Sequence, residues 1–390
     1  MKILWFPRLQ FDIDKLHVTT WREMYSALEN NGVSVKIAIA GNDVDNILNL
    51  PYIKIPIIKV KFLRVLTFLI SGYLKFIWNF LVYKPEVVIF DIYSIWFAFP
   101  LSLFSRKNCL FIIDNRTPIY DLMFRATIED KVMKYYTRLA YIYCRYFLDG
   151  MTVINWYYKK QICTDFNFKA TDIGVWGSGV NMEIFSPQKY KQIERPSFLK
   201  GKFVLMQHGE LSVRRGVLET IEAIGLLKNK DIVFVILGEG KAQNKIIQKI
   251  KELGLEKRVY VLPAVPYYKV PAYISYCDCA IMAYPDIEYW NNNSPIKLIE
   301  YFAMGKPVIC TDIWTFRDVA GDKKCAYYIA NNNPETIANA INYCSRNSLF
   351  LDEWGREGIK IVRERYTWNK QAENLLDFIR HLHNKPKYQS

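Results

Sequence analysis

The chain has 390 residues, of which 51% are hydrophobic and 23% are charged. This composition is that of an ordered globular protein and excludes a disordered chain, and the length is enough for two or three domains. The formal net charge of +14 favours a polyanionic partner, which would be a phosphorylated ligand, an anionic membrane surface or nucleic acid, although a soluble basic surface fits the composition as well.

The first half of the chain alternates short apolar runs with longer helical patterns. One helical pattern covers residues 19–30 and ends at Asn31-Gly32, a favourable helix stop before a strand. Another covers residues 121–147. Near-continuous apolar strands that alternate with helices predict a parallel doubly wound α/β sheet. The predicted strands of this half are residues 3–6, 35–40, 87–90, 110–113, 151–154 and 173–175.

The segment most like a membrane helix is VKFLRVLTFLISGYLKFIWNFLVYK, residues 60–84. Lys61, Arg64 and Lys75 interrupt it, so it contains no uncharged span of eighteen residues. We predict a crossover helix of the core with an unusually apolar face. The alternative is a basic, aromatic helix that lies on a membrane surface.

A polar stretch separates the two halves of the chain. Residues 186–201, SPQKYKQIERPSFLKG, are typical of a domain linker. The strand and helix alternation then restarts, with strands predicted at 203–207, 232–237, 259–262, 279–283, 308–310 and 326–329. We therefore predict a Rossmann-like domain over 1–185, a linker over 186–201, a second Rossmann-like domain over 202–366 and a C-terminal helix within 367–390, which could pack on either domain.

The cysteines and aspartates show no convincing metal pattern. The eight cysteines are scattered and lack the close pairs of a zinc site, which indicates reduced, buried thiols in a cytosolic protein. Asp12-x-Asp14 and Asp43-x-Asp45 have metal-like spacing, but we interpret both as polar loops.

Ligands of parallel α/β sheets bind beyond the carboxyl ends of the strands, so the loops after strands are the candidate site. The first strand of the second domain is followed by His208 and Gly209, and Arg214, Arg215 and Gly216 open the next helix. Positive side chains beside free helix N–H groups suit a phosphate. An ordinary exposed basic turn is the alternative.

A glycine turn follows the next strand, where Gly238 and Gly240 stand in ILGEG. It is not the complete dinucleotide fingerprint, because Gln243 occupies the position of the third glycine. A bare pair of glycines at this place is therefore a weak indication of a ligand.

The stretch NNNSPIKLIEYFAMGKPVI, residues 291–309, is predicted to start a helix beside the site. Ser294 is a natural N-cap and Pro295 suits the first helical position. Lys297 and Glu300 are three residues apart and share one face, so together they suit a diphosphate and a ribose diol. The alternative is an ordinary surface pair.

Taken together, HGEL…RRGV, ILGEG and SPIKLIEYFAMGKPVI resemble the C-terminal half of a retaining glycosyltransferase of family 4. The resemblance implies a GT-B architecture with two Rossmann-like domains facing across a cleft. It also implies transfer of a hexose-type sugar, with retention, from a nucleotide sugar to a glycan or lipid-linked acceptor in cell-surface polysaccharide or glycolipid assembly.

The resemblance assigns roles to residues of the second domain. It implies that Arg215 contacts the donor diphosphate, that Glu300 binds the ribose hydroxyls, and that Ser294 and Lys297 lie near the phosphates and the sugar. A glutamate expected near the sugar is replaced by Asn292. The expected donor-site residues are Gly209, Arg215, Gly238, Ser294, Lys297 and Glu300.

The first domain departs further from the resemblance. PRLQFDIDK stands where the family has a glycine-rich loop, and Asp114 stands where it often has a histidine. Asp114, Asn115 and Arg116 are the expected acceptor-side residues, and Asp114 could orient the acceptor hydroxyl or accept its proton. A turn cap is the alternative for Asp114. His17 is a further acceptor-side candidate, although a lone histidine near a helix start is often structural.

Catalysis is expected to rest on Asp114, Arg215 and Glu300, with the charge of the leaving nucleoside diphosphate stabilised by Arg215, Lys297 and the helix start. No metal or other cofactor is therefore expected. Alternatives are another GT-B enzyme, such as a nucleotide-sugar epimerase or a phosphorylase, and a non-catalytic basic protein that binds membrane or nucleic acid. We expect no nucleic-acid partner and a cytoplasmic protein, with peripheral membrane contact through its basic, aromatic first domain.

Overall fold

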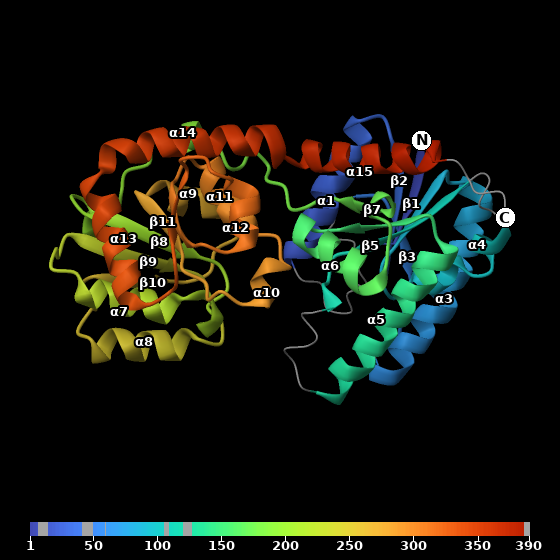
Figure 1. Ribbon diagram of the computed structural model, residues 1–390, viewed down its shortest axis with the longest axis horizontal. Coiled ribbons are helices and arrows are strands. Elements are labelled where there is room, and N and C mark those ends of the chain that lie inside the picture. Colours follow the sequence, from blue (N-terminus) through green and yellow to red (C-terminus); the bar gives the residue numbers. More distant parts are fainter. Residues whose placement is uncertain (7–14, 41–49, 59, 105–108, 120–126, 386–390) are drawn as a thin grey trace. The chain divides into compact units, whose positions relative to one another are not determined.

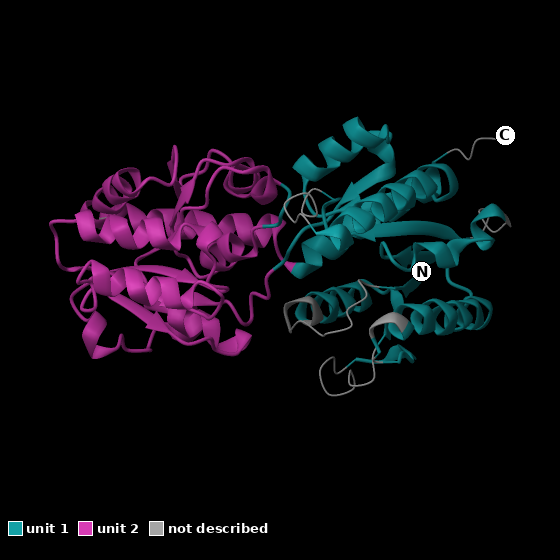
Figure 2. Cartoon of the chain, turned by 90° about the horizontal axis from the view of Figure 1, so that it is seen from below, with its two compact units in different colours: residues 1–179, 292–294, 368–390 teal, residues 180–291, 295–367 magenta. Residues whose placement is uncertain are grey.

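A computed structural model describes residues 1–6, 15–40, 50–58, 60–104, 109–119 and 127–385 (Figure 1). The chain divides into two compact units, coloured separately in Figure 2. Unit 1 comprises residues 1–179, 292–294 and 368–390, and unit 2 comprises residues 180–291 and 295–367. The polar stretch 186–201 lies in unit 2, where it contains the 3-10 turns Pro187–Tyr190 and Ser197–Leu199.

The sheet of unit 1 has seven strands in the order β3-β2-β1-β4-β5-β6-β7, and neighbouring strands are parallel. Strands β4 and β5 are buried along their whole length, which explains their continuous apolar sequences. The edge strand β3 was not predicted. The strands are β1 (Lys2–Trp5), β2 (Ser34–Ala40), β3 (Tyr52–Ile55), β4 (Val87–Phe90), β5 (Leu110–Asn115), β6 (Gly150–Val153) and β7 (Ile173–Val175).

Helices cover both faces of this sheet. On one face α1 (Lys15–Asn30) packs with α15 (Trp368–Asn384), so the C-terminal helix belongs to unit 1. The other face is covered by α3 (Lys61–Tyr83), α5 (Ile128–Phe147) and α6 (Trp156–Phe166), with the 3-10 turn η1 (Ile95–Ala98) and α4 (Leu101–Phe104) after β4. Right-handed crossovers that run in the same direction along a sheet place their helices on the same face, which explains this grouping.

Two of these helices begin at side-chain caps. Thr127 accepts a hydrogen bond from the backbone N–H of Asp130 at the start of α5. Asn155 accepts one from the N–H of Tyr158 at the start of α6. Such caps satisfy N–H groups that have no partner inside the helix, and α5 therefore starts at Ile128.

The sheet of unit 2 has six strands in the order β10-β9-β8-β11-β12-β13, again with parallel neighbours. Its strands follow the predicted ones closely: β8 (Phe203–His208), β9 (Ile232–Leu237), β10 (Val259–Leu262), β11 (Cys279–Met282), β12 (Val308–Thr311) and β13 (Ala326–Ile329). Its helices are α7 (Val217–Leu226), α8 (Gln243–Glu252), α9 (Val270–Ser275), α10 (Glu288–Asn291), α11 (Ile296–Ala303), α12 (Trp314–Ala320), α13 (Pro334–Arg346) and α14 (Ser348–Arg365).

The strand order places a topological switch point inside unit 2. The chain runs outward from β8 through β9 to β10 and then returns to β11 on the other side of β8. Loops after β8 and β11 therefore diverge at the carboxyl edge of the sheet, which is where ligands of such folds bind. The predicted fold class, two doubly wound parallel-sheet α/β domains, is confirmed.

The cysteines agree with the interpretation as thiols. All eight are free, and Cys163 is the one that is not fully buried. Burial raises the pKa of Cys277 to about 11, because the low-dielectric interior disfavours a thiolate. Within the described residues there is no group of three or more His, Cys, Asp or Glu side chains that could hold a metal ion. The pairs Asp12-x-Asp14 and Asp43-x-Asp45 lie outside the described residues.

Candidate functional site

A pocket of about 390 Å³ lies in unit 2 at the carboxyl ends of β8, β9 and β10. One side is polar and is formed by the end of β8 and the loop after it. The other side is apolar and includes Leu237, Ala264, Val265 and Val270. A concave site with a few polar groups on an apolar wall is the usual form of a small-molecule site. The lining residues are His208, Gly209, Glu210, Leu237, Gly238, Glu239, Ala264, Val265 and Val270.

A buried acid-imidazole pair borders this pocket. His208, the last residue of β8, places Nε2 2.8 Å from Oε2 of Glu300 on α11. The two side chains are 6% and 3% exposed. The backbone N–H of His208 donates to the hydroxyl of Tyr301 at 2.9 Å, and the two rings meet edge to face. The Nδ1 atom of His208 is buried and has no hydrogen-bond partner among the described residues.

Lys297 lies one turn before Glu300 and reaches back over the loop after β8. A Cβ on Gly209 would lie 2.2 Å from Cε and 2.9 Å from Nζ of Lys297, so glycine leaves the space that this side chain occupies. Burial lowers the pKa of Lys297 to about 7, and the nearby cation Arg215 adds to this effect. In the described part of the chain, the ammonium group forms no hydrogen bond or ion pair.

Arg215 supplies the second positive charge at this edge. Its guanidinium donates to Oε2 of Glu210 at 3.0 Å, but Glu210 is 64% exposed, so solvent weakens this pair. The guanidinium also lies 5.7 Å from the ring of Trp290. Its Nε atom is buried and has no hydrogen-bond partner within the described ranges. Arg215 and Lys297 therefore place two positive charges at this edge, near the carboxylates of Glu210 and Glu300.

Backbone packing holds the loops that carry these residues. The N–H of Gly209 donates to the carbonyl of Leu237 at 2.8 Å. Gly216 follows Arg215 in the sequence and has φ of +66°. Its backbone packs against the residue after β11, so a Cβ at this position would lie 1.7 Å from the carbonyl oxygen of Ala283. Glycine is required at this position by both space and φ.

Gly238 provides the first testable consequence of this packing. Its φ is +146°, and a Cβ would lie 2.0 Å from the carbonyl oxygen of Gly209. We expect Gly238→Ala to lower the free energy of unfolding by about 2–4 kcal/mol, since the backbone of one loop has to move. Thermal unfolding measures this. Gly254→Ala is the control, because Gly254 has φ of +62° but no atom within 4 Å; equal effects of the two substitutions would contradict the argument.

The start of α11 differs from the prediction. The helix begins at Ile296, with Pro295 at the N-cap position and no side-chain cap, so the expectation that Ser294 caps it is wrong. The hydroxyl of Ser294 instead accepts a hydrogen bond from the backbone N–H of Ser178 at 3.1 Å. Residues 292–294 belong to unit 1, where Asn155 Nδ2 also donates to the carbonyl of Asn293 at 3.1 Å. Asn292, which stands where a glutamate was expected, is fully buried.

The candidates for the acceptor side lie at the end of β5 in unit 1. Asp114 is 6% exposed and accepts a hydrogen bond from Thr152 Oγ1 at 2.8 Å. Burial raises the pKa of Asp114 to about 6, although Arg116 opposes the rise. Arg116 donates to the carbonyl of Trp176 at 2.7 Å and stacks 3.7 Å over its ring.

Asn115 points in another direction. It is 2% exposed, and its Nδ2 donates to the hydroxyls of Tyr141 and Tyr158. These three side chains form a buried polar network. We infer that Asn115 holds the strand end in place and does not itself contact a ligand. His17 is part of helix α1, but the structure does not describe its side chain.

The raised pKa of Asp114 makes a second testable prediction. In the folded chain its pKa lies above the ordinary 3.8, so the charged form destabilises the fold and stability is lost as pH rises toward 6. We expect Asp114→Asn to raise the free energy of unfolding at pH 8 by up to about 3 kcal/mol, because asparagine keeps an acceptor for Thr152. The gain should disappear near pH 4. Thermal unfolding at several pH values measures it, and a variant that is less stable than wild type at pH 8 would contradict it.

Several contacts of the unit 2 site could not be predicted from the sequence. The sequence places His208 at the end of a strand but gives no signal for its pairing with Glu300. Tyr301 follows Glu300 directly, and nothing in the sequence distinguishes it from a core aromatic residue. Glu210 and Trp290 are separated from Arg215 by five and seventy-five positions, and only the fold brings them together.

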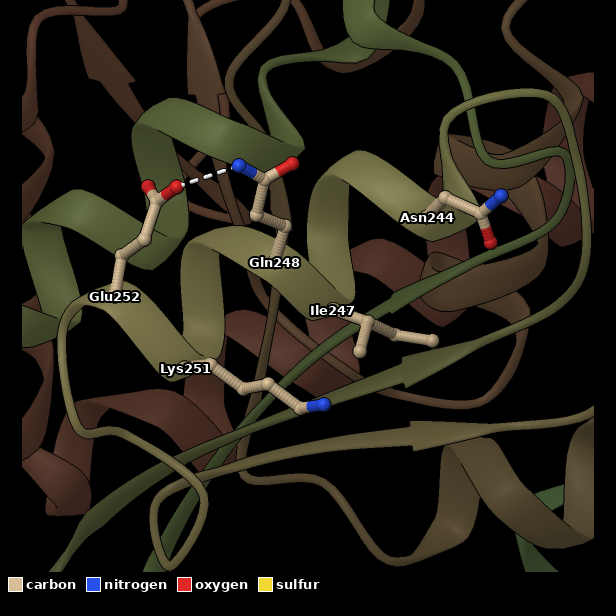
Figure 3. Close-up of a pocket in the computed structure, with 5 residues that line it drawn as sticks. All are labelled: Asn244, Ile247, Gln248, Lys251 and Glu252. Carbon is tan, nitrogen blue, oxygen red and sulfur yellow. Dashed lines mark hydrogen bonds between the residues drawn. The ribbon is translucent and has the colours of Figure 1, made fainter.

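A second hollow in unit 2 runs along the outer side of α8 (Figure 3). It is lined by five exposed residues of that one helix, and Gln248 Nε2 donates to Glu252 Oε1 at 2.8 Å. No strand end or loop contributes to its lining. It is a surface groove of a helix and does not compete with the pocket at β8.

Comparisons with known sequences find a family and several relatives. Residues 189–361 match the protein family described as Glycosyl transferases group 1. The chain is 26% identical over 301 residues to the "Putative teichuronic acid biosynthesis glycosyltransferase TuaH" of Bacillus subtilis (strain 168), covering 76% of this chain and 68% of that one. It is 25% identical over 162 residues to the "O-antigen biosynthesis glycosyltransferase WclY" of Escherichia coli, and this match spans 42% of each chain.

Comparison with solved structures supports the architecture. Anabaena Alr3699/HepE in complex with UDP superposes with a TM-score of 0.77 at 14% identity, covering 97% of this chain and 100% of that one. Sucrose-phosphate synthase from Thermosynechococcus elongatus gives a TM-score of 0.73 at 15% identity, covering 98% and 99%. Residues 189–361 thus match the glycosyl transferases group 1 family, and the chain has the GT-B architecture.

Proposed function

We propose that the chain is a retaining hexosyltransferase of family 4 that uses a nucleotide sugar, with UDP as the nucleotide, to extend a glycan or lipid-linked acceptor of the cell surface. The observation that carries the proposal is the convergence of Lys297, Arg215 and the His208–Glu300 pair beside one pocket of unit 2. The names of the relatives from Bacillus subtilis and Escherichia coli, and the UDP in the Anabaena structure, support the same choice.

The positive pair is the proposed diphosphate site. Lys297 and Arg215 repel each other, and the acid paired with Arg215 is largely exposed. A diphosphate between them would offset the repulsion between the two cations, and the bonds to it would be charge-assisted. During transfer the bond from the anomeric carbon to the diphosphate breaks, and the same two cations stabilise the charge that develops on the departing oxygen.

The rest of the nucleotide fits the pocket in this proposal. Glu300, held by His208, would accept hydrogen bonds from the ribose hydroxyls. The apolar wall formed by Ala264, Val265 and Val270 would pack against the base. Gly209 and Gly238 line the same pocket, and the absence of a Cβ at Gly209 leaves the room that Lys297 needs to reach this edge.

On the acceptor side we assign Asp114 as the proton acceptor. For the configuration to be retained, the acceptor oxygen bonds to the anomeric carbon on the same face from which the diphosphate leaves, and the hydroxyl proton passes to the Asp114 carboxylate. A carboxyl pKa of about 6 leaves this group ionised at neutral pH while keeping it basic enough to take a proton. Arg116, which opposes the rise in that pKa, would position it.

Donor affinity is expected to depend on pH through Lys297. In the free chain its pKa is about 7, and a bound diphosphate would raise it. Below pH 7 the ammonium is already charged and affinity is highest; above pH 7 binding must take up a proton, so affinity should fall by roughly tenfold per pH unit. Calorimetric titration of a nucleotide sugar in buffers of different ionisation enthalpy measures both quantities. Constant affinity from pH 6 to 9 would contradict the assignment.

A donor panel tests the function as a whole. The purified chain is incubated with different nucleotide sugars, with and without acceptor, in the presence of EDTA. We expect release of the nucleotide that an acceptor accelerates and that EDTA does not abolish, because protein cations replace a metal here. Conversion of the sugar without acceptor would favour an epimerase, and a need for inorganic phosphate would favour a phosphorylase. Failure to bind any nucleotide sugar would refute the proposal.

A further inference from the structure

Helix α5 exposes a continuous row of large apolar side chains. They recur at spacings of three and four, so they form one stripe along the helix, and Ile128 at its start is 80% exposed. The opposite side of α5 packs into the core through Tyr141 and Cys144. The row consists of Ile128, Val132, Tyr135, Leu139, Ile142 and Tyr146.

Helix α3 carries a matching row. Over Leu63–Tyr83 the helix is long and apolar enough to cross a membrane, and only 17% of its apolar eighteen-residue stretch is buried. Its inner side is fixed in the core by Phe68 and Phe76, while Trp78 on the outer side is 67% exposed. The outer row consists of Leu63, Leu66, Ile70, Leu74, Trp78 and Leu81.

The two rows belong to the same side of unit 1. Both helices pack on the same core cluster and cover the same face of the sheet (Figure 1). The turn η1 lies between them: Trp96 contacts Tyr136 and Tyr143 of α5, and Phe97 contacts Phe68 of α3. Exposed Phe99 and Leu103 follow η1. We call the outer rows of α3 and α5, with these two residues, the α3–α5 face.

Basic residues accompany the apolar rows. On α5, Lys131, Lys134, Arg138 and Arg145 follow the same helical spacing, about a quarter turn from the apolar stripe. Lys75 is exposed on α3. An apolar stripe beside a basic stripe is the pattern of helices that lie in the interface of an anionic bilayer, with apolar groups among the acyl chains and cations at the phosphates.

We propose that the α3–α5 face docks unit 1 onto the surface of a membrane that contains anionic lipid. The apolar area is larger than scattered surface residues produce. The positive charge of these basic residues argues against a second copy of the chain as the occupant. A symmetric dimer through this face would bring the basic residues of the two copies together. The negative charge of lipid phosphates instead complements the basic residues beside the apolar rows.

The α3–α5 face lies on the surface and α3 does not span the membrane. A Cβ on Gly72, in the middle of α3, would lie 2.8 Å from the ring of Phe97, so the helix backbone is packed tightly against η1. Insertion across a bilayer would remove Phe68 and Phe76 from the core, whereas docking leaves both in place. The docked face would present unit 1 to a lipid-linked acceptor, but the binding itself does not rest on the proposed function.

Vesicle sedimentation tests the proposal with the full chain and no donor or acceptor present. The vesicles contain phosphatidylcholine either alone or mixed with phosphatidylglycerol. We expect binding to the mixed vesicles that weakens with salt. The double variant Leu139→Ser plus Ile142→Ser should bind at least about tenfold more weakly. The matched control is Leu226→Ser plus Leu349→Ser, which changes exposed leucines of unit 2.

A charge series and a fluorescence measurement complete the test. Lys131→Gln plus Arg138→Gln should weaken binding to mixed vesicles, while Lys241→Gln plus Lys251→Gln in unit 2 should not. Brominated lipids should quench wild-type fluorescence more than that of Trp78→Phe. Absence of vesicle binding would overturn the proposal, as would equal binding of both leucine variants. Self-association that the Leu139 and Ile142 substitutions abolish, without vesicle binding, would assign the face to a second copy instead.

Discussion

Replacing Glu300 with glutamine is expected to lower kcat/KM for sugar transfer by about a hundredfold or more, since the buried carboxylate that we propose as the acceptor of hydrogen bonds from the ribose is lost. Glutamine has nearly the same shape, and its amide can still bond Nε2 of His208, which now lies 2.8 Å from Oε2. The fold should therefore survive, with a melting temperature close to that of wild type. Steady-state kinetics with a nucleotide-sugar donor and thermal unfolding measure the two effects.

The matched control is Glu252→Gln, which changes an exposed glutamate of α8 in the same unit. We expect wild-type kinetics for this variant. His208→Gln should reproduce part of the loss, because Glu300 is then held less firmly. An unchanged kcat/KM in Glu300→Gln would show that Glu300 does not take part in donor binding or transfer.

Replacing Lys297 with methionine is expected to weaken the binding of a nucleotide sugar and to lower kcat/KM by about a hundred- to a thousandfold. The same variant should melt at a slightly higher temperature, because methionine fills the space over Gly209 without placing an amine in a site that disfavours its charge. These opposite signs distinguish a ligand-binding lysine from a structural one. Calorimetric titration and thermal unfolding give the two readouts.

Lys251→Met, on the exposed side of α8, is the control for removing one charge from unit 2. It should change neither donor affinity nor melting temperature. In Lys297→Met the fall of affinity above pH 7 should also vanish. A variant that melts lower and binds the donor normally would show that Lys297 supports the fold and not the ligand.

Burial decides which parts of the fold could be predicted from sequence. Strand β9 is buried at every residue, so its apolar run IVFVIL stands out from the helices around it. Strand β3, with the sequence YIKI, has one buried residue and lies at the sheet edge. Its alternation is too short to be distinguished from a loop, and it was not predicted.

The candidate site could be predicted from the sequence where it depends on residues a few positions apart. It could not be predicted where a side chain contacts residues that are far away in the sequence. The predicted pairing of Lys297 and Glu300 on one helix face agrees with their contacts to Gly209 and His208. The predicted capping of α11 by Ser294 is wrong, because the hydroxyl accepts a hydrogen bond from a backbone N–H 116 positions away. His208 and Glu300 are 92 positions apart, and no local pattern indicates their contact.

The segment 60–84 shows a related limit. Its composition allowed both a core helix and a surface helix, and the structure shows features of each: Phe68 and Phe76 pack into the core, while Leu74 and Trp78 are exposed. Sequence periodicity places apolar residues around most of the helix, so it does not show which side has a partner. Which side of α3 is buried depends on the turn η1. This turn comes from another part of the chain and packs against one side of the helix only.

Mass spectrometry of the reaction product tests most directly whether the site in unit 2 transfers sugar. The full chain is given a panel of UDP-sugars and an extract of cell-surface acceptors, with Glu300→Gln and Lys297→Met as parallel samples. We expect wild type to add one sugar residue to an acceptor and to release UDP, and both variants to form little product. Consumption of a UDP-sugar without any glycosylated product, or equal product from all three proteins, would contradict the assignment of these residues to a glycosyltransferase donor site.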